Sequence, residues 1–220
     1  MRTVTVRPTR SGKVFDVVVL DDVASLQWAA QIGAIEIHPY LGTVDALDRP
    51  TSAVFDLDPG AGLGLLDAAR AAQLVHDVLD GLGLDSYVKT SGQKGVHVVV
   101  PLDGTQTYDD VKPFVRAVAA LLVRERPDEL TDTMARTARA GKVLIDWSQN
   151  DAGKSTVAPY SLRGLRVPLA STPVAWDELD AAIRSGRVRD LVFTGDEVRA
   201  RIDDLGDLFE PTLETNQRLP

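Results

Sequence analysis

The chain has 220 residues and no cysteine, which excludes disulfide bonds and thiolate metal sites. Apolar residues make up 44% and charged residues 25%, the balance of an ordinary globular protein, and the net charge of −8 argues mildly against nucleic acid as a partner. That objection is partial, because binding depends on local charge. The sequence has no apolar run of membrane-spanning length and no signal core near Met1, so we expect a cytoplasmic protein.

The spacing of apolar residues predicts several elements in the first half of the chain. A strand is expected at 14–20, followed by a helix that begins at a cap, Asp21 or Asp22, and runs to about Ile32. Further along, the pattern indicates a short alternating strand at 34–40, a loop at 41–50, a strand at 51–58 and a helix at 65–82.

The second half continues with strands and helices in turn. Strands at 85–90 and 96–102 are expected to form a hairpin around the turn 91–95, and a helix follows at 108–124. Residues 127–141 are ambiguous, and the remaining elements are a strand at 142–146 and helices at 176–183 and 196–205. With no repeat or linker, this order predicts one α+β domain over residues 1–220, in which helices flank a largely antiparallel sheet and 176–220 forms C-terminal helices.

Two carboxylates interrupt the apolar run AVFDLDPG. Asp56 and Asp58 lie one residue apart in an expected strand, so they share one face with Cα atoms roughly 7 Å apart. Carboxylates held so close repel unless a cation lies between them, and a divalent metal is the usual solution. The alternative is a strand end with two solvated acids.

The turn SGQKG is the second feature with chemical potential. Gly92 and Gly95 let the backbone approach a ligand, and Ser91, Lys94 and His97 add hydrogen-bond donors, a combination that suits a phosphate chain. Turns of this composition are also common hairpin tips, and His97 is equally readable as a core histidine.

A third acid, Asp146, ends the strand at 142–146. It would complete a metal site begun by Asp56 and Asp58, or it caps a turn. The polar stretch after it contains Gln149, Lys154 and Arg163.

The three segments VFDLDPG, TSGQKGVHVVVPL and IDWSQNDAGKSTVAPYSLR, in this order, resemble the polymerase domain of bacterial non-homologous end-joining ligase D. This is a branch of the archaeo-eukaryotic primase superfamily. The upstream LQWAAQIGAIEIHPYLG matches as well, so the resemblance covers roughly 15–175. It implies a primase-type α+β catalytic core with a mixed or antiparallel sheet. The implied activity is nucleotidyl transfer from an NTP or dNTP to a DNA 3′ end, in end joining or gap filling.

The resemblance also implies roles for individual residues. Asp56, Asp58 and Asp146 match the catalytic acids, which hold two divalent cations, Mn²⁺ or Mg²⁺, with a preference for manganese and for ribonucleotides. The positions that match nucleotide contacts are His38, Ser91, Lys94, His97, Gln149, Arg163 and, as a weaker candidate, Lys154. His76 matches nothing and is interpreted as a surface residue.

The implied partners are primer–template, gapped or broken DNA, an NTP or dNTP, a separate DNA ligase and a Ku-type end-binding protein, in a nucleoid-associated protein. Two clusters of basic residues could follow a DNA backbone. The first contains Arg124, Arg126, Arg136, Arg139 and Lys142, and the second contains Lys154, Arg163 and Arg166. A solvated helix face explains the first cluster equally well. We expect most of the N-terminal segment usual in such domains to be missing, since only Arg2, Arg7, Arg10 and Lys13 offer basic side chains there.

Two other functions compete with polymerase activity. A DxD phosphohydrolase usually has a small hydroxyl residue after its acids, whereas Pro59 follows here and leaves SGQKG without a role. A non-catalytic DNA-binding scaffold has no physical need for the three acids.

Overall fold

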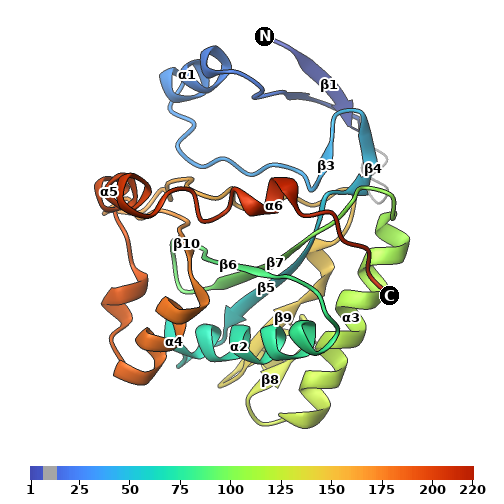
Figure 1. The fold of residues 1–220 in the computed structure, drawn as a ribbon, viewed down its shortest axis with the longest axis vertical. Helices are drawn as coiled ribbons and strands as arrows, with labels where there is room; N and C mark the ends of the chain where they lie inside the picture. Colours follow the sequence, from blue (N-terminus) through green and yellow to red (C-terminus); the bar gives the residue numbers. More distant parts are fainter. Residues whose placement is uncertain (7–13) are drawn as a thin grey trace.

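The fold is described from a computed structural model of the chain, for residues 1–6 and 14–220 (Figure 1). Arg7, Arg10 and Lys13 lie outside the described residues. The principal sheet has six strands in the order β10-β6-β7-β5-β9-β8. In that order they span Pro173–Val174, Tyr87–Thr90, Val96–Pro101, Ser52–Pro59, Val143–Asp146 and Leu130–Thr131. All neighbours in this sheet are antiparallel except β8 and β9, so the sheet is mixed, as expected.

The other strands form two small hairpins before β5. Strand β1 (Thr3–Val6) pairs with β2 (Phe15–Val18), and β3 (Gly42–Thr43) pairs with β4 (Ala46–Pro50). The helices are α1 Val23–Gln31, α2 Leu65–Gly81, α3 Tyr108–Glu125, α4 Trp176–Ser185, α5 Gly195–Leu205 and α6 Pro211–Glu214, with 3₁₀ turns η1 Arg136–Arg139, η2 Trp147–Gln149 and η3 Val188–Leu191. No helix in the described ranges is long and apolar enough to cross a membrane.

The main core lies between one face of the sheet and the long helices α2 and α3. Alternate strand residues such as Phe55, Leu57, Val96 and Val98 are fully buried there. They pack with the helix stripes Ala68, Ala72, Val75 and Leu79 of α2 and Val111, Val115, Val118 and Leu122 of α3. The intervening strand residues point to the opposite face, which carries a smaller apolar cluster that includes Val54 and Val99. The sheet residues Asp56, Asp58, Lys89, His97 and Asp146 all lie on that second face.

Several expected elements differ in the structure. Residues 34–40 are extended but do not form a strand, because their backbone pairs with the segment 155–161 rather than with a sheet: Ile37 N donates to Ser161 Oγ (2.8 Å) and Ala158 N to Ile37 O (2.9 Å). The expected loop at 41–50 contains the β3–β4 hairpin, and β1 was not predicted.

His76 is also placed differently from the prediction. Its ring stacks on Trp176 with centroids 4.0 Å apart, and Nδ1 lies 3.0 Å from Ser86 Oγ. The histidine is half-buried between α2 and α4 because the tryptophan of a later helix covers it.

Candidate active site

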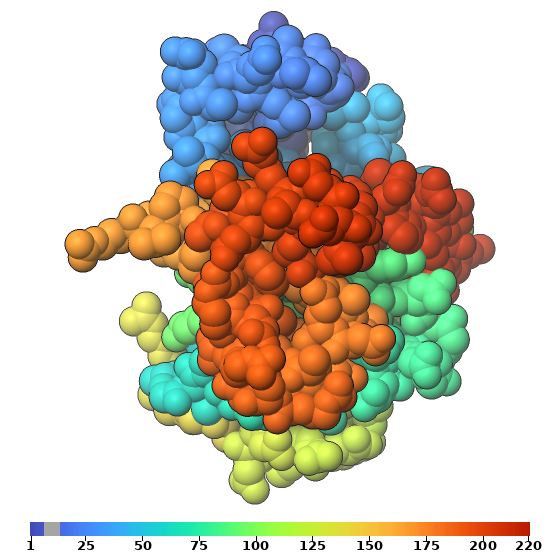
Figure 2. Space-filling model, turned by 60° about the vertical axis from the view of Figure 1, so that its left-hand side comes forward, coloured from blue at the N-terminus to red at the C-terminus, as the bar shows by residue number. Residues whose placement is uncertain are grey.

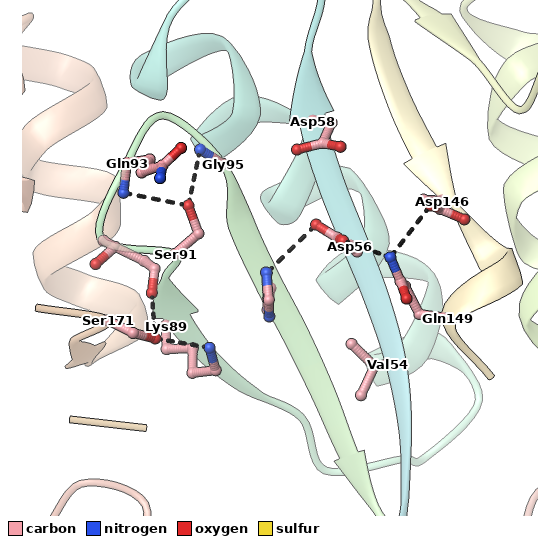
Figure 3. Close-up of polar contacts among 12 residues, drawn as sticks. Val54, Asp56, Asp58, Lys89, Ser91, Gln93, Gly95, Asp146, Gln149 and Ser171 are labelled. Atoms are coloured by element: carbon pink, nitrogen blue, oxygen red, sulfur yellow. Dashed lines mark hydrogen bonds and ion pairs between the residues drawn. The ribbon is translucent and has the colours of Figure 1, made fainter. Parts of the chain in front are cut away.

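A row of four side chains crosses the second face of the sheet. Strand register places Lys89 of β6 opposite His97 of β7, His97 opposite Asp56 of β5, and Asp56 opposite Asp146 of β9. Directly opposed residues point to the same face, so the row is contiguous, as the labelled members in Figure 3 show. Asp58 extends it along β5 from Asp56, on the shared face that the alternation predicts.

Two neutral or cationic side chains hold the carboxylate of Asp56. His97 Nε2 lies 3.3 Å from Asp56 Oδ1, and the Gln149 amide donates to Asp56 Oδ2 (3.2 Å) and to Asp146 Oδ2 (3.3 Å). Burial pushes the pKa of Asp56 upward, but His97, Lys89 and Gln149 together bring that pKa below its ordinary value. Asp56 is therefore a stable anion.

Asp58 behaves in the opposite way. Burial raises its pKa, and the carboxylates of Asp56 and Asp146 raise it further, while Arg139, whose guanidinium lies 3.4 Å from Asp58 Oδ2, opposes both effects. The raised pKa of Asp58 thus reflects its burial first, and then its repulsion by the two other acids on the same face.

This donor set fits a hard divalent cation. All three side chains offer carboxylate oxygens, which suit Mg²⁺ or Mn²⁺ and do not suit Zn²⁺. Within residues 1–6 and 14–220, no three acidic or histidine side chains are gathered into a ready-made metal site. Gln149 lies against Asp56 and Asp146, and Arg139 lies against Asp58. A cation held by these acids would compete with those two contacts.

The glycine turn lies beside the acids. Ser91 Oγ accepts hydrogen bonds from Gln93 N (3.3 Å) and Gly95 N (3.1 Å), so the hydroxyl shapes the turn (Figure 3). Lys94, the next residue after Gln93, is exposed. A Cβ on Gly92, whose φ is +73°, would lie 2.6 Å from Arg163 Cγ. A Cβ on Gly95 would lie 3.3 Å from Asp58 Oδ1. Both glycines therefore permit close packing between the turn, the arginine and the acids.

A second wall is built from two segments far apart in sequence. The segment 34–40 carries His38 and runs beside 155–164, which carries Arg163, with Lys154 exposed just before the Tyr40–Ser155 bridge. Arg163 Nη1 donates to Ser91 O (3.1 Å), which ties this wall to the glycine turn. The segment 34–40 also lines a cavity of about 630 Å³ beneath β2 and α1. The structure thus brings the predicted nucleotide contacts to one side of the sheet.

Sequence reasoning missed the contacts of four residues in this region, of which Arg139 was named only as a member of a basic cluster. Glu36 contacts both His38 and Arg163, Arg139 contacts Asp58, and Lys89 ends the polar row. Asn150, which is fully buried, accepts from Val54 N (2.8 Å) and donates to Val54 O (2.7 Å). Its side chain thereby makes the two hydrogen bonds to Val54 that a residue of a neighbouring strand would make. These bonds fix the position of η2, so that Gln149 faces the acids. Lys89 carried a local signal, as a charged residue in a short expected strand, where it follows Tyr87 and Val88.

Lys89 gives a prediction about pH and stability. Its side chain is 2% exposed and donates to Ser171 Oγ (2.8 Å). Burial lowers the pKa of Lys89 from 10.5 to about 7, although Asp56 pulls it upward. Between those values the unfolded chain binds more protons at Lys89 than the folded chain does, so this residue should make the free energy of unfolding rise with pH.

Urea unfolding at several pH values checks this prediction. Lys89→Met should be more stable than the parent below pH 7, and the difference should shrink by up to about 1.4 kcal/mol per pH unit as the pH rises from 7 to 10.5. Lys94→Met, at an exposed position, is the control and should follow the parent. Parallel curves for Lys89→Met and the parent would show that the buried amine does not titrate in this range.

Comparison with known proteins agrees with this fold. A family model described as LigD, primase-polymerase domain, matches residues 1–209. The multifunctional non-homologous end joining protein LigD of Mycolicibacterium smegmatis is 40% identical over 195 residues, which cover 88% of this chain and 25% of that protein. The bifunctional LigD of Bacillus subtilis is 31% identical over 193 residues. The polymerase domain of Mycobacterium tuberculosis ligase D in complex with DNA has a TM-score of 0.84 and 35% identity, covering 98% of this chain and 75% of that one.

The fold and the polar row thus define a primase-type nucleotidyltransferase domain. The chain belongs to the LigD primase-polymerase domain family. It spans about a quarter of the length of the mycobacterial relatives that it matches. The family match extends beyond 15–175 on both sides, into β1 and through α5.

Proposed function

We propose that this chain transfers a nucleotide from an NTP or dNTP to a DNA 3′ end, in end joining or gap-filling repair. The observation that carries the proposal is the row of Asp146, Asp56 and His97, which lies beside the glycine turn and Arg163. The carboxylates that would bind cations therefore lie next to the cationic side chains that would bind a triphosphate. Membership of the LigD primase-polymerase family supports this function.

In this proposal Asp56, Asp58 and Asp146 hold two divalent cations, Mn²⁺ or Mg²⁺, consistent with the metal dependence of the family. Cations bound there would lower the pKa of a primer 3′-hydroxyl and neutralise charge on the leaving pyrophosphate. The residues of the chain itself do the positioning. His97 holds Asp56 from one side, and Gln149 bridges Asp56 and Asp146 from the other as long as no cation takes its place.

The triphosphate is assigned to the glycine turn and the second wall. Lys94 places an exposed ammonium at the tip of the turn, and Arg163 presents a guanidinium whose fork matches phosphate oxygens. His38 and Lys154 are exposed on the same wall, where either can reach a phosphate group. Ser91 acts mainly by holding the turn.

DNA is assigned to the basic residues around η1 and the loop after η2. Arg124 and Arg136 are exposed, as are Lys154 and Arg166. Arg126 pairs with Glu129 (3.3 Å) and Lys142 donates to Pro127 O (2.5 Å), so these two contribute less to such a track. The similar polymerase domain of M. tuberculosis ligase D was solved in complex with DNA, which supports DNA as the partner.

The wider setting follows from the relatives. Their names refer to non-homologous end joining, and we propose that this chain acts beside a DNA ligase and a Ku-type end-binding protein. The corresponding location is the cytoplasm, in association with the nucleoid.

A primer-extension assay tests the function. The protein is incubated with labelled primer–template or gapped duplex, each NTP or dNTP, and Mn²⁺ or Mg²⁺ in turn. We expect extension by at least one nucleotide, and chelation of the cation should abolish it. A folded protein that binds the duplex but extends no primer under any combination would instead support the scaffold alternative. Phosphomonoester hydrolysis without extension would support the phosphohydrolase.

A further inference from the structure

Glu36 is a point of convergence that the proposed mechanism does not use. Its Oε1 accepts a hydrogen bond from Gly164 N (2.6 Å), and its Oε2 lies 3.0 Å from His38 Nε2 and 3.3 Å from Arg163 Nε. One carboxylate therefore joins the segment 34–40 to the loop at 161–165. A Cβ on Gly164 would lie 3.2 Å from Glu36 Oε1, so the loop backbone approaches this carboxylate closely.

The charge on Glu36 is maintained by its partners. The Gly164 N–H and His38 hold the pKa of this carboxyl below its ordinary value. The side chain is 31% exposed, so its interactions are partly screened by water, but the side chain of Arg163 is only 15% exposed. The arginine is thus the more buried member of the pair and depends more on having a counter-charge.

The contact between Glu36 and Arg163 is electrostatic rather than directional. Arg163 Nε is buried and makes no hydrogen bond to the residues that the structure describes, although Glu36 Oε2 is within ion-pair distance. Arg163 Nη1, by contrast, donates to Ser91 O in the glycine turn. The guanidinium is therefore held between a fixed acceptor on the glycine turn and the negative charge of Glu36 on its own wall, and neither contact uses Nη2.

We propose that Glu36 is a positioning residue, which holds Arg163 against the glycine turn so that its guanidinium meets the triphosphate. This inference rests on the proposed function, because it takes Arg163 to be a triphosphate contact. Figure 2 shows the surface concerned, where the light-orange segment around 160–170 projects below the blue N-terminal part. The carboxylate itself would repel a triphosphate, so it can favour nucleotide binding only by holding Arg163 in position.

A double-mutant cycle separates positioning from a merely structural role. Glu36→Gln keeps a side-chain oxygen for Gly164 N but removes the charge that holds Arg163. The affinity for a non-hydrolysable ATP analogue with Mn²⁺, measured by calorimetry, should fall roughly fivefold or more. In an Arg163→Ala background the same substitution should leave affinity unchanged or improve it, because the carboxylate then only repels the phosphates.

Controls keep the outcomes distinct. Glu178→Gln breaks a bidentate ion pair with Arg201 between α4 and α5, removes the same charge, and should not change nucleotide affinity. An equal loss from Glu36→Gln in both backgrounds, or no loss in either while Arg163→Ala weakens binding, would overturn the inference. If Arg163→Ala itself leaves nucleotide affinity unchanged, the triphosphate assignment in the proposed function fails instead. Thermal unfolding of each variant confirms that it remains folded.

Discussion

Primer extension should become undetectable when Asp56 or Asp146 is replaced by asparagine. Each substitution keeps the shape of the side chain and removes one charge from a pair that register places face to face. Loss of a residue that merely supports a metal ligand costs roughly 10–100-fold. Loss of a ligand should exceed that, so we expect a decrease of at least about 100-fold in the rate of nucleotide addition. The assay is extension of a labelled primer with Mn²⁺.

The fold should survive these substitutions. The acids project from the face of the sheet away from α2, and the repulsion that raises the pKa of Asp58 decreases when a neighbouring charge is removed. Thermal unfolding should therefore stay close to that of the parent. Asp80→Asn, exposed on α2, is the matched control and should extend primers normally. Extension at the parental rate by either active-site variant would refute the assignment of the acids.

Gly60→Ala should have the largest effect on stability. Gly60 follows β5 directly, and its N–H donates to Lys142 O (2.9 Å). An added Cβ would lie 1.7 Å from Arg139 O and 2.7 Å from Lys142 O, which are backbone atoms that no side-chain rotation can move. The segment from η1 to β9 would have to shift away from β5. We expect a loss of about 3 kcal/mol or more in the free energy of unfolding, measured with urea.

A second glycine provides the control for this experiment. Gly81 is the last residue of α2, and a Cβ there would meet no atom within 4 Å. Gly81→Ala should therefore stabilise the protein by about 0.5–1 kcal/mol, through the lower entropy of the unfolded chain. If Gly60→Ala unfolds at the same urea concentration as the parent, the close approach of β5 to the 139–142 segment is not as described.

Local sequence patterns were sufficient to predict much of the fold. The helical spacing of apolar residues located α2 and α3 within a residue or two of their ends, and two glycines marked the β6–β7 turn. The shared face of Asp56 and Asp58 also follows from alternation alone. The position of Asp146 beside Asp56 does not, because it depends on pairing between strands about ninety residues apart. The residue pattern left this position open, and the resemblance favoured it.

The residues that sequence analysis missed were overlooked for a common physical reason. Asn150 and Glu36 act through hydrogen bonds to backbone groups that lie far away in the sequence, Val54 and Gly164. No period or composition reports such contacts. For a related reason, His76 was interpreted as a surface residue and Lys89 was overlooked. A polar side chain in a strand or helix is expected to face water unless later elements cover it. Here the segment around Ser171 and the helix α4 cover them.

The dependence of the row on register limits which changes in chain length the domain can accept. A single-residue insertion or deletion inside β5, β7 or β9 would turn that strand's polar residue into the core and bring an apolar one to the site. The same change in the connection at 103–107, which precedes α3, would shift no member of the row. Engineering that lengthens or splits this domain should therefore be confined to its connections, where a linker or a circular permutation leaves the alignment of the four strands intact.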